Sequence, residues 1–535
     1  MSGRRLKFWG WGYEDAGPTP EQTEKLARLL QERFGLGAGE RTDPPRIEEI
    51  RLRPPRVRPP AQLDAVASAH PYDRASHTYG KGFRDVVRAL RRDFSPAPDV
   101  VVFPKDEEQI DAVLEWASRE KLAVIPYGGG SSVVGGVEPR VGDAYAGAVT
   151  LDLRRFDRVL EVDRVSRAAR IQAGVYGPRL EEQLKPHGLT LRHFPQSFEF
   201  SSLGGWIATR SGGHYATLYT HIDEFVESLR VRTPGGAVET RRLPASGAGP
   251  DPNRLFIGSE GILGVITEAW MRVQDRPKYR ASAAVTFADF ADAVEAVRAI
   301  AQAGLYPSNC RLLDAGEALV SGAGTGAEHV LVLGFESADH PPDAWMDRAL
   351  ECCRDHGGRV PEGAGKTRTD PEAGREGAAG AWRKAFLEAP YLRDALVCLG
   401  MVTETFETAV TWDRFGEFHA GVREAVEDAL RRICGSGMVT CRFTHVYPDG
   451  PAPYYTVTAP GKKASQLEQW DEIKAAASEA VLRLGGTITH HHAVGRDHRP
   501  WYDRERPGVF GEMLKAAKKA LDPSGVLNPG VLVDP

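Results

Sequence analysis

Two hydrophobic patterns alternate along the chain and predict a protein of mixed helices and strands. From Pro98 onward, a short apolar run is followed by apolar residues at helical spacing, a second apolar run and a glycine-rich stretch. Ile110, Val113, Leu114 and Ala117 recur at intervals that place them on one face of a helix. This stretch is therefore predicted to form a strand, a helix, a strand and a glycine loop.

Further patterns divide the rest of the chain. Short alternating runs predict several strands, and Pro234-Gly235-Gly236 predicts the turn of a hairpin. A second block begins near Ala281 and contains a long amphipathic helix over 413–434. The first 90 residues are rich in proline and arginine, which predicts an extended arm or a small helical cap. The expected fold class is α+β, with units at 1–90, 91–276, 277–475 and 476–535.

Length and composition exclude some classes of protein. A chain of 535 residues is too long for one hydrophobic core, so two or three domains are expected. The formal net charge of -5 does not indicate nucleic-acid binding. No window approaches the roughly 20 apolar residues that cross a bilayer, and no apolar run of signal-peptide length follows the first residues. We expect a cytoplasmic protein, with peripheral membrane contact left open.

A glycine loop follows the second apolar run of the first block. Consecutive glycines let backbone N–H groups approach an anion closely, and serines add hydroxyl donors. The loop fits neither the P-loop pattern nor GxGxxG. Taken alone, it is either a pyrophosphate site or a flexible turn. Its residues are Pro126, Tyr127, Gly128, Gly129, Gly130, Ser131 and Ser132.

Two later regions have the same small, hydroxyl-rich character and favour a long ligand threaded between backbone segments. The first region contains Gln196, Ser197, Phe198, Glu199, Phe200, Ser201 and Ser202, followed by Thr209, Arg210, Ser211 and Gly212. The second contains Glu260, Gly261, Ile262, Leu263, Gly264, Val265 and Ile266. We predict that these residues bind a cofactor.

Together these segments resemble the FAD domain shared by vanillyl-alcohol oxidase, D-lactate dehydrogenase and glycolate oxidase subunits. The resemblance implies a PCMH-type FAD-binding domain of two subdomains over 91–276 and an α+β substrate-binding cap over 277–475. Residues 476–535 would return to the flavin. The glycine loop would hold the pyrophosphate, and the SEGILGVIT stretch would lie near the adenine and ribose. No histidine is clearly marked for covalent attachment, so non-covalent FAD is expected.

Five segments sharpen the resemblance: FWGWGY, PQSFEFSSLGGWIATRSGG, APYLRD, TETFETAVTWDR and ITHHHAVGRDHRPW. They are similar to segments of the alkylglycerone-phosphate synthase (alkyl-dihydroxyacetonephosphate synthase) family. Members of that family replace the acyl chain of an acyl-dihydroxyacetone phosphate with a fatty alcohol, which yields an ether lipid precursor without net redox change. The flavin N5 is thought to hold the substrate carbon covalently while the carboxylate leaves.

The resemblance places a catalytic tyrosine at Tyr454. Pro453 before it and Thr456 after it depart from the family's Tyr-Phe-Tyr-Phe pattern, which leaves Tyr455 open as the base. A phenol can act as a base only if nearby cations lower its pKa of about 10. Without the resemblance, both tyrosines would be interpreted as ordinary aromatic residues of a strand.

Two arginines are candidates for binding anionic groups. Arg393 in YLRD aligns with the family's substrate-binding arginine, and a guanidinium fork can hold a phosphate or a carboxylate. The alternative is a salt bridge with Asp394. Arg311 in NCRLLD matches another important arginine of the family, and its alternative is a structural ion pair.

Three consecutive histidines end a predicted strand, and alternation would put His490 and His492 on one face and His491 on the other. Two histidines make a poor metal site without a third ligand, so no metal is expected. The favoured interpretation is a segment that hydrogen-bonds substrate and supplies positive charge near the flavin. A solvated surface run is the alternative.

Two other functions stay open at this stage. One is an FAD-linked oxidase or dehydrogenase of a 2-hydroxy acid, which shares the fold. The other is a flavin-binding protein without turnover. The expected partners are lipid substrates, a phosphorylated ketone ester and a long-chain alcohol, with no nucleic acid. A homodimer is left open.

Overall fold

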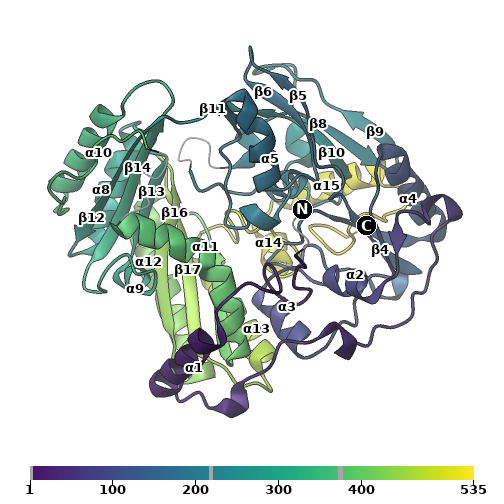
Figure 1. Ribbon diagram of the computed structural model, residues 1–535, viewed down its shortest axis with the longest axis horizontal. Helices are drawn as coiled ribbons and strands as arrows, with labels where there is room; N and C mark the ends of the chain where they lie inside the picture. Colours follow the sequence, from purple (N-terminus) through teal and green to yellow (C-terminus); the bar gives the residue numbers. More distant parts are fainter. Residues whose placement is uncertain (1–3, 216–220, 371–376, 535) are drawn as a thin grey trace.

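The computed structural model of the chain describes residues 4–215, 221–370 and 377–534. They form two adjoining halves, which Figure 1 shows side by side. One half, here called the glycine-loop half, contains three small sheets, and the other, the cap, contains one sheet of six strands. Both ends of the described chain lie in the glycine-loop half (Figure 1). The last residues of the protein therefore return to the half that the first block forms.

The first sheet has the predicted strand, helix, strand and loop order. Its strands lie in the order β1 (Ala67–Ser68), β2 (Val100–Val102), β4 (Gly147–Asp152) and β3 (Leu122–Tyr127). Helix α4 (Glu107–Glu120) begins after Asp106, which accepts the N–H of Gln109 at 2.9 Å. The predicted apolar face of α4, including Ile110 and Val113, is buried in the core of this sheet. Strand β3 ends at the glycine loop.

The second sheet is antiparallel throughout. Its order is β5 (Val159–Asp163), β6 (Ala168–Gln172), β10 (Val265–Arg272), β8 (Val226–Thr233) and β9 (Gly236–Glu239). Strands β8 and β9 form the hairpin predicted at Pro234-Gly235-Gly236. Its core includes residues of α5 (Gly177–Leu184), α6 (Leu203–Thr209) and α15 (Gly508–Leu521). A short ribbon pairs β7 (Leu189–Thr190) with β11 (Gln274–Asp275).

The cap sheet is also antiparallel. Its order is β12 (Tyr279–Phe287), β14 (His329–Ser337), β13 (Asn309–Leu313), β16 (Met438–Val446), β17 (Pro451–Pro460) and β15 (Met401–Glu407). One face packs on α8 (Phe290–Gln302), α10 (Asp343–Asp355), α12 (Trp412–Cys434) and α13 (Gln466–Arg483). The other face packs on α9 (Ala315–Val320) and α11 (Gly377–Cys398). Helix α12 confirms the long helix expected from the sequence.

The N-terminal region crosses from one half to the other. Helix α1 (Pro20–Phe34) packs by Leu30 on Leu399 and Met401 of the cap, and Figure 1 shows it beneath the cap sheet. The remaining helices are α2 (Pro71–Ser76), α3 (Phe83–Leu90), α7 (Asn253–Phe256) and α14 (Arg499–Glu505). Among the described residues, none of the helices combines the length and apolarity that a bilayer crossing needs.

The C-terminal segment corrects one sequence expectation. Residues 487–492 form a loop and not a strand, because the N–H groups of His490, His491 and His492 donate to the carboxylate of Glu407. A strand would direct those groups to a neighbouring strand instead. After α15, Leu527 forms a parallel bridge to Val124 of β3, so the chain ends beside the first sheet.

Candidate active site

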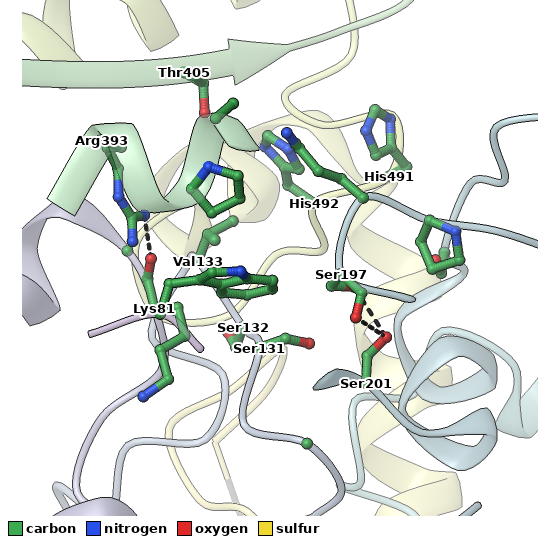
Figure 2. A pocket seen from close by; sticks show the side chains of 18 of the residues that line it. Lys81, Ser131, Ser132, Val133, Ser197, Ser201, Arg393, Thr405, His491 and His492 are labelled. Atoms are coloured by element: carbon green, nitrogen blue, oxygen red, sulfur yellow. Dashed lines mark hydrogen bonds between the residues drawn. The ribbon is translucent and has the colours of Figure 1, made fainter. Parts of the chain in front are cut away.

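A cavity of about 1210 Å³ lies where the glycine-loop half meets the cap. Figure 2 shows side chains facing it from both sides: Ser131, Ser132, Ser197 and Ser201 from the glycine-loop half, and Thr405, His491 and His492 across from them. The cap contributes its wall from β15, β16, β17 and α11. One continuous space therefore joins the predicted cofactor segments to the predicted catalytic residues.

Most residues predicted to bind the cofactor line this cavity. They are Pro126, Tyr127, Gly128, Gly129, Gly130, Ser131, Ser132, Gln196, Ser197, Ser201, Ser202, Thr209, Ser211, Gly212, Glu260, Gly261, Gly264, Val265 and Ile266. The lining does not include Phe198, Glu199, Phe200, Arg210, Ile262 and Leu263. Ile262 and Leu263 belong to the core of the second sheet, and Arg210 pairs with Asp223 at 3.3 Å.

The glycine loop is tightly packed against the turn that contains Phe200. A Cβ on Gly129 would collide with the backbone carbonyl oxygen of Phe200, and a Cβ on Gly128 would collide with the hydroxyl of Ser202. Gly130 has a φ of +66°, which favours glycine. The loop thus keeps its backbone N–H groups and serine hydroxyls beside the cavity. This donor set, and the length of the small-residue lining, fit the pyrophosphate of FAD.

Glu260 joins the second predicted segment to the C-terminal loop. Its carboxylate accepts the N–H groups of Val494 and Gly495, both at 2.8 Å. The side chain is buried, and burial raises the pKa of Glu260 to about 7. Asn528 donates to the Glu260 carbonyl oxygen at 2.7 Å. The carboxyl group therefore positions the chain just after the histidines.

The two candidate tyrosines point in opposite directions. Tyr454 lines the cavity, whereas Tyr455 stacks on Phe406 in the core of the cap, with ring centroids 4.9 Å apart. The Tyr455 hydroxyl lies 3.0 Å from Nδ1 of His419. Strand alternation explains the difference, because neighbours on β17 face opposite sides of the sheet. Of the two tyrosines, only Tyr454 can reach a substrate in the cavity.

An arginine that the sequence analysis did not single out lies against Tyr454. The guanidinium carbon of Arg442 is 3.9 Å from the Tyr454 ring centroid. Arg442 also donates to Glu317 at 2.5 Å. The pKa of Tyr454 is raised overall, because burial outweighs the opposing effect of the Arg442 cation, so the lowering expected from nearby cations is not reached. The position could have been found from the sequence only by pairing β16 with β17, which sets Arg442 opposite Tyr454.

Arg311 is a buried cation with unused donors. Its Nη2 donates to Nδ1 of His214 at 3.0 Å, and its guanidinium carbon lies 4.7 Å from the ring centroid of Trp382. Its Nε and Nη1 atoms have no partner in the described part of the chain. Burial and repulsion from Arg442 lower the pKa of Arg311 to about 9. Because Arg311 lines the cavity, these free N–H groups form a site for an anion.

Glu407 organises the three histidines. It accepts the N–H groups of His490 at 2.6 Å and His492 at 2.7 Å, and the hydroxyl of Thr489 at 2.6 Å. His491 and His492 line the cavity. His490 lies behind them, with its Nε2 2.7 Å from the hydroxyl of Tyr447. The loop therefore places two of the three predicted catalytic histidines, His491 and His492, at the cavity.

Arg393 lines the cavity but is engaged by protein groups. Its Nη2 donates to Asp394 at 2.6 Å, and its Nη1 donates to the carbonyl oxygen of Lys81, a bond drawn in Figure 2. Asp394 in turn accepts the N–H of Trp11 at 2.6 Å. These bonds tie α11 to the glycine-loop half and to the N-terminal arm. These bonds use three of the five N–H groups of Arg393, one on each nitrogen, so a second N–H on Nη1 and on Nη2 is left for a substrate anion.

The fold brings His445 to the histidine loop and so supplies the third imidazole that the sequence pattern lacked. One ring nitrogen each of His445, His490 and His491 lie within 4.8 Å of one another. Burial lowers the pKa of all three well below the usual range. Repulsion from Arg311 contributes at His445 and His491, and the same repulsion would act on a metal cation. With pKa values this low the imidazoles are neutral at neutral pH, so they do not supply the positive charge that the sequence analysis expected near the flavin.

Comparison with known proteins identifies the family of this chain. The family described as FAD binding domain matches residues 98–241, and the one described as FAD linked oxidases, C-terminal domain, matches residues 276–532. A curated alkyldihydroxyacetonephosphate synthase from Dictyostelium discoideum is 30% identical, over 91% of this chain and 83% of the relative. The chain belongs to the alkyldihydroxyacetonephosphate synthase family. FAD is its cofactor, as expected from the glycine loop and the two later segments.

A solved structure supports the same assignment. A structure of an alkyldihydroxyacetonephosphate synthase superposes on this family member with a TM-score of 0.80, at 25% identity over 98% of each chain. A D-lactate dehydrogenase [cytochrome] from Arabidopsis thaliana is 27% identical, over 82% of this chain and 74% of the relative. The family resemblance and the α+β fold, with an FAD domain and a cap, are thereby confirmed.

Proposed function

We propose that this synthase-family member exchanges the acyl chain of an acyl-dihydroxyacetone phosphate for a long-chain alcohol. The observation that carries the proposal is that two buried arginines, Arg311 and Arg442, line the same cavity as Tyr454, with Arg442 against the Tyr454 ring. Nε and Nη1 of Arg311 and Nε of Arg442 have no partner among the described residues. A phosphate dianion would satisfy these donors, because guanidinium groups bind phosphate oxygens in a fork.

The exchange conserves oxidation state. The bond between carbon 1 of the ketone phosphate and the ester oxygen breaks, and a bond from the same carbon to the alcohol oxygen forms. The fatty acid leaves as a carboxylate, and the proton of the alcohol is released. FAD, when bound, supplies the centre through which the two groups are exchanged. The protein groups must hold the phosphate, take a proton from carbon 1 and return one to it later in the cycle, and stabilise the departing carboxylate.

Tyr454 is the proposed base. It lines the cavity, and its burial keeps water from competing for the proton. Arg442 stabilises the phenolate form, because a cation near a phenol favours its ionised state. The proton on carbon 1 is acidified by the adjacent ketone, so a buried phenolate is a suitable acceptor. Arg311, His491 and His492 provide N–H groups toward the anionic substrate and leaving group.

The experiment that tests this function follows both products. Purified protein is incubated anaerobically with acyl-dihydroxyacetone phosphate and hexadecan-1-ol, and fatty acid and ether product are measured together. We expect equal amounts of each, with oxidised flavin after every turnover and no electron acceptor required.

The rival, oxidation of a 2-hydroxy acid, gives the opposite result. In that case D-lactate, glycolate or a longer 2-hydroxy acid bleaches the flavin anaerobically, and turnover then needs oxygen, a quinone or a dye. Bleaching of this kind without acyl–alkyl exchange would reject the proposed transfer and leave an FAD-linked dehydrogenase.

A further inference from the structure

A chain of three imidazoles leads from the cavity toward solvent. His491 lines the cavity, and its ring centroid lies 6.2 Å from that of Tyr454. Its Nδ1 is 3.0 Å from Nδ1 of His490, and Nε2 of His490 is 3.1 Å from Nε2 of His221. His221 is also bonded to the carbonyl oxygen of Arg210, and this last bond is exposed to solvent. The chain of ring nitrogens therefore connects the cavity with water.

Two distant parts of the fold hold the outer pair of rings together. His221 belongs to the glycine-loop half, where its backbone forms an antiparallel bridge with Gly212. His490 belongs to the C-terminal loop, where its N–H donates to Glu407 of the cap at 2.6 Å. The two rings meet edge to face with their centroids 4.6 Å apart. Their contact is fixed by the backbone on both sides.

The outer end of the chain sets the positions of the ring hydrogens in its neutral state. The Arg210 carbonyl oxygen lies 2.9 Å from Nδ1 of His221 and can only accept, so Nδ1 carries the hydrogen and Nε2 is bare. His490 must then donate through Nε2, and His491 through Nδ1. Nε2 of His491 is left as an acceptor. The hydroxyl of Tyr447, 2.7 Å from Nε2 of His490, fits this arrangement and its reverse, because a hydroxyl both donates and accepts.

A proton that binds Nε2 of His491 reverses the chain. Nδ1 of His491 then passes its hydrogen to Nδ1 of His490, and Nε2 of His490 passes its hydrogen to Nε2 of His221. Only N–H bonds break and form, and the extra charge ends on His221. His491 now has its hydrogen on Nε2. The same ring that accepted a proton can therefore donate an N–H to a departing carboxylate.

The outer histidine holds the extra charge better than the inner two. Burial lowers the pKa of His490 and His491 well below the usual range, and it lowers the pKa of His221 less. The charged groups that act on the pKa of His221 are Asp223 and Glu407, which raise it, and Arg210, which lowers it. Oδ1 of Asp223 has no hydrogen-bond partner among the described residues. These charges favour movement of a proton from the cavity outward.

We propose that His491, His490 and His221 form a proton relay that carries the proton of the incoming alcohol from the cavity to water. This inference rests on the proposed function, because the exchange releases that proton. The O–H bond of the alcohol breaks as its oxygen bonds to carbon 1, and the proton moves to Nε2 of His491. The Glu407 carboxylate, 3.4 Å from Nδ1 of His491, stabilises the passing charge. Once His221 has given the proton to water, the ring hydrogens return to the arrangement that the Arg210 carbonyl favours.

The test removes the outer histidine from the FAD-loaded protein. His221→Ala should lower kcat of the exchange by about a hundredfold, the lower end of what positioned proton-transfer groups contribute. Added imidazole should restore the rate of His221→Ala in a saturable manner and should not speed the natural protein. In mixtures of H2O and D2O, kcat of the natural protein should fall along a curve, because several protons move together. In His221→Ala without imidazole, it should fall along a straight line.

Matched variants separate a relay from a structural role. His221→Gln keeps an acceptor and a donor but cannot carry a proton, so it should be as slow as His221→Ala with natural flavin content and melting temperature. His340→Ala removes an exposed histidine between β14 and α10 and should change neither the rate nor the isotope response.

Two results would overturn the relay while leaving the proposed function intact. One is a natural rate of exchange in His221→Ala or His221→Gln. The other is a slow His221→Ala that imidazole does not restore. If the natural protein itself exchanges no acyl chain for an alcohol, the proposed function is rejected instead, and the relay with it.

Discussion

Arg442 lies over the ring of Tyr454, with its guanidinium carbon 3.9 Å from the ring centroid. The arginine is held there by Glu317, which accepts its Nη1 at 2.5 Å. The contact places a fixed cation beside a buried phenol, the arrangement that favours phenolate in an otherwise unfavourable environment. The cation is supplied by the neighbouring strand β16, at a position that the sequence analysis did not single out.

Tyr454→Phe should lower turnover by about a hundredfold or more with FAD still bound, because general bases typically contribute that much. Tyr455→Phe is the matched control, since that hydroxyl meets His419 on the core side of the sheet. Steady-state assays with flavin content measured in parallel check the ranking. A larger loss at Tyr455 than at Tyr454 would remove Tyr454 from the mechanism.

Arg442→Lys should move the rising limb of the pH–activity profile to higher pH. Lysine keeps the charge but not the planar group over the ring, so the phenol of Tyr454 should ionise less readily. A base acts above its pKa, and a higher pKa therefore shifts the limb upward. Arg432→Lys, a surface position on α12, serves as the control. An unshifted limb in Arg442→Lys would show that Arg442 does not set the pKa of the base.

Glu407→Gln should loosen the histidine loop. The Glu407 carboxylate accepts three consecutive backbone N–H groups. In the Gln variant one of the two accepting oxygens is replaced by an NH2 group, which would point its own hydrogens at the backbone N–H groups. The backbone amides and the histidines lower the pKa of Glu407 to about 2, so the group is ionised at neutral pH. We expect at least a tenfold loss in kcat/KM and faster proteolysis within 487–498.

The control for Glu407→Gln is Glu427→Gln, which alters a carboxylate on α12 that pairs with Arg423. Unchanged kinetics and unchanged proteolysis in Glu407→Gln would show that the loop does not depend on this carboxylate.

Gly129→Val should abolish FAD retention. The reason is backbone packing, because a Cβ at this position would collide with the Phe200 carbonyl oxygen and push the loop away from its neighbouring turn. Gly416→Ala on α12, where nothing lies within 4 Å of an added Cβ, is the control. The ratio of flavin to protein absorbance after purification measures the outcome. Normal flavin content in Gly129→Val would mean that this loop is not part of the cofactor site.

Glu260 should make stability fall as pH rises from about 4.5 to 7. Its pKa in the folded protein is raised to about 7, so the folded state binds the proton more tightly than the unfolded state. The stability that Glu260 contributes is fully present at pH values below its pKa in the unfolded chain. It is lost as the pH rises through its pKa in the folded protein. A difference of about 2.5 units corresponds to roughly 3 kcal/mol at most.

Glu260→Gln imitates the protonated group, because its amide oxygen still accepts the Val494 or Gly495 N–H. The variant should have a smaller fall in melting temperature between pH 5 and pH 8 than the natural protein. If the melting temperatures of the two proteins fall by the same amount between pH 5 and pH 8, Glu260 does not have this role.

Local chemistry made several features predictable. The helix over Glu107–Glu120 and the glycine loop after it follow from apolar spacing, an aspartate cap and glycine runs, all of which act over a few residues. The hairpin of β8 and β9 follows from its turn residues. FAD could be expected as the cofactor for the same reason, since small residues near an anion are required wherever a backbone must approach it closely.

The part of the cavity that contains the predicted catalytic residues depended on pairing between distant segments. The sequence by itself determined the FAD fold, the family motifs and the presence of Tyr454, Arg311 and the histidines. Only the tertiary structure decided that Arg442 meets Tyr454, and that Glu407 replaces a neighbouring strand as the acceptor for the histidine loop. It also decided that Arg393 donates to the carbonyl oxygen of Lys81, which lies 312 residues away, whereas its salt bridge with the adjacent Asp394 was one of the two alternatives that the sequence left open. The distant contacts depend on strand register, helix placement and burial, which no local pattern encodes.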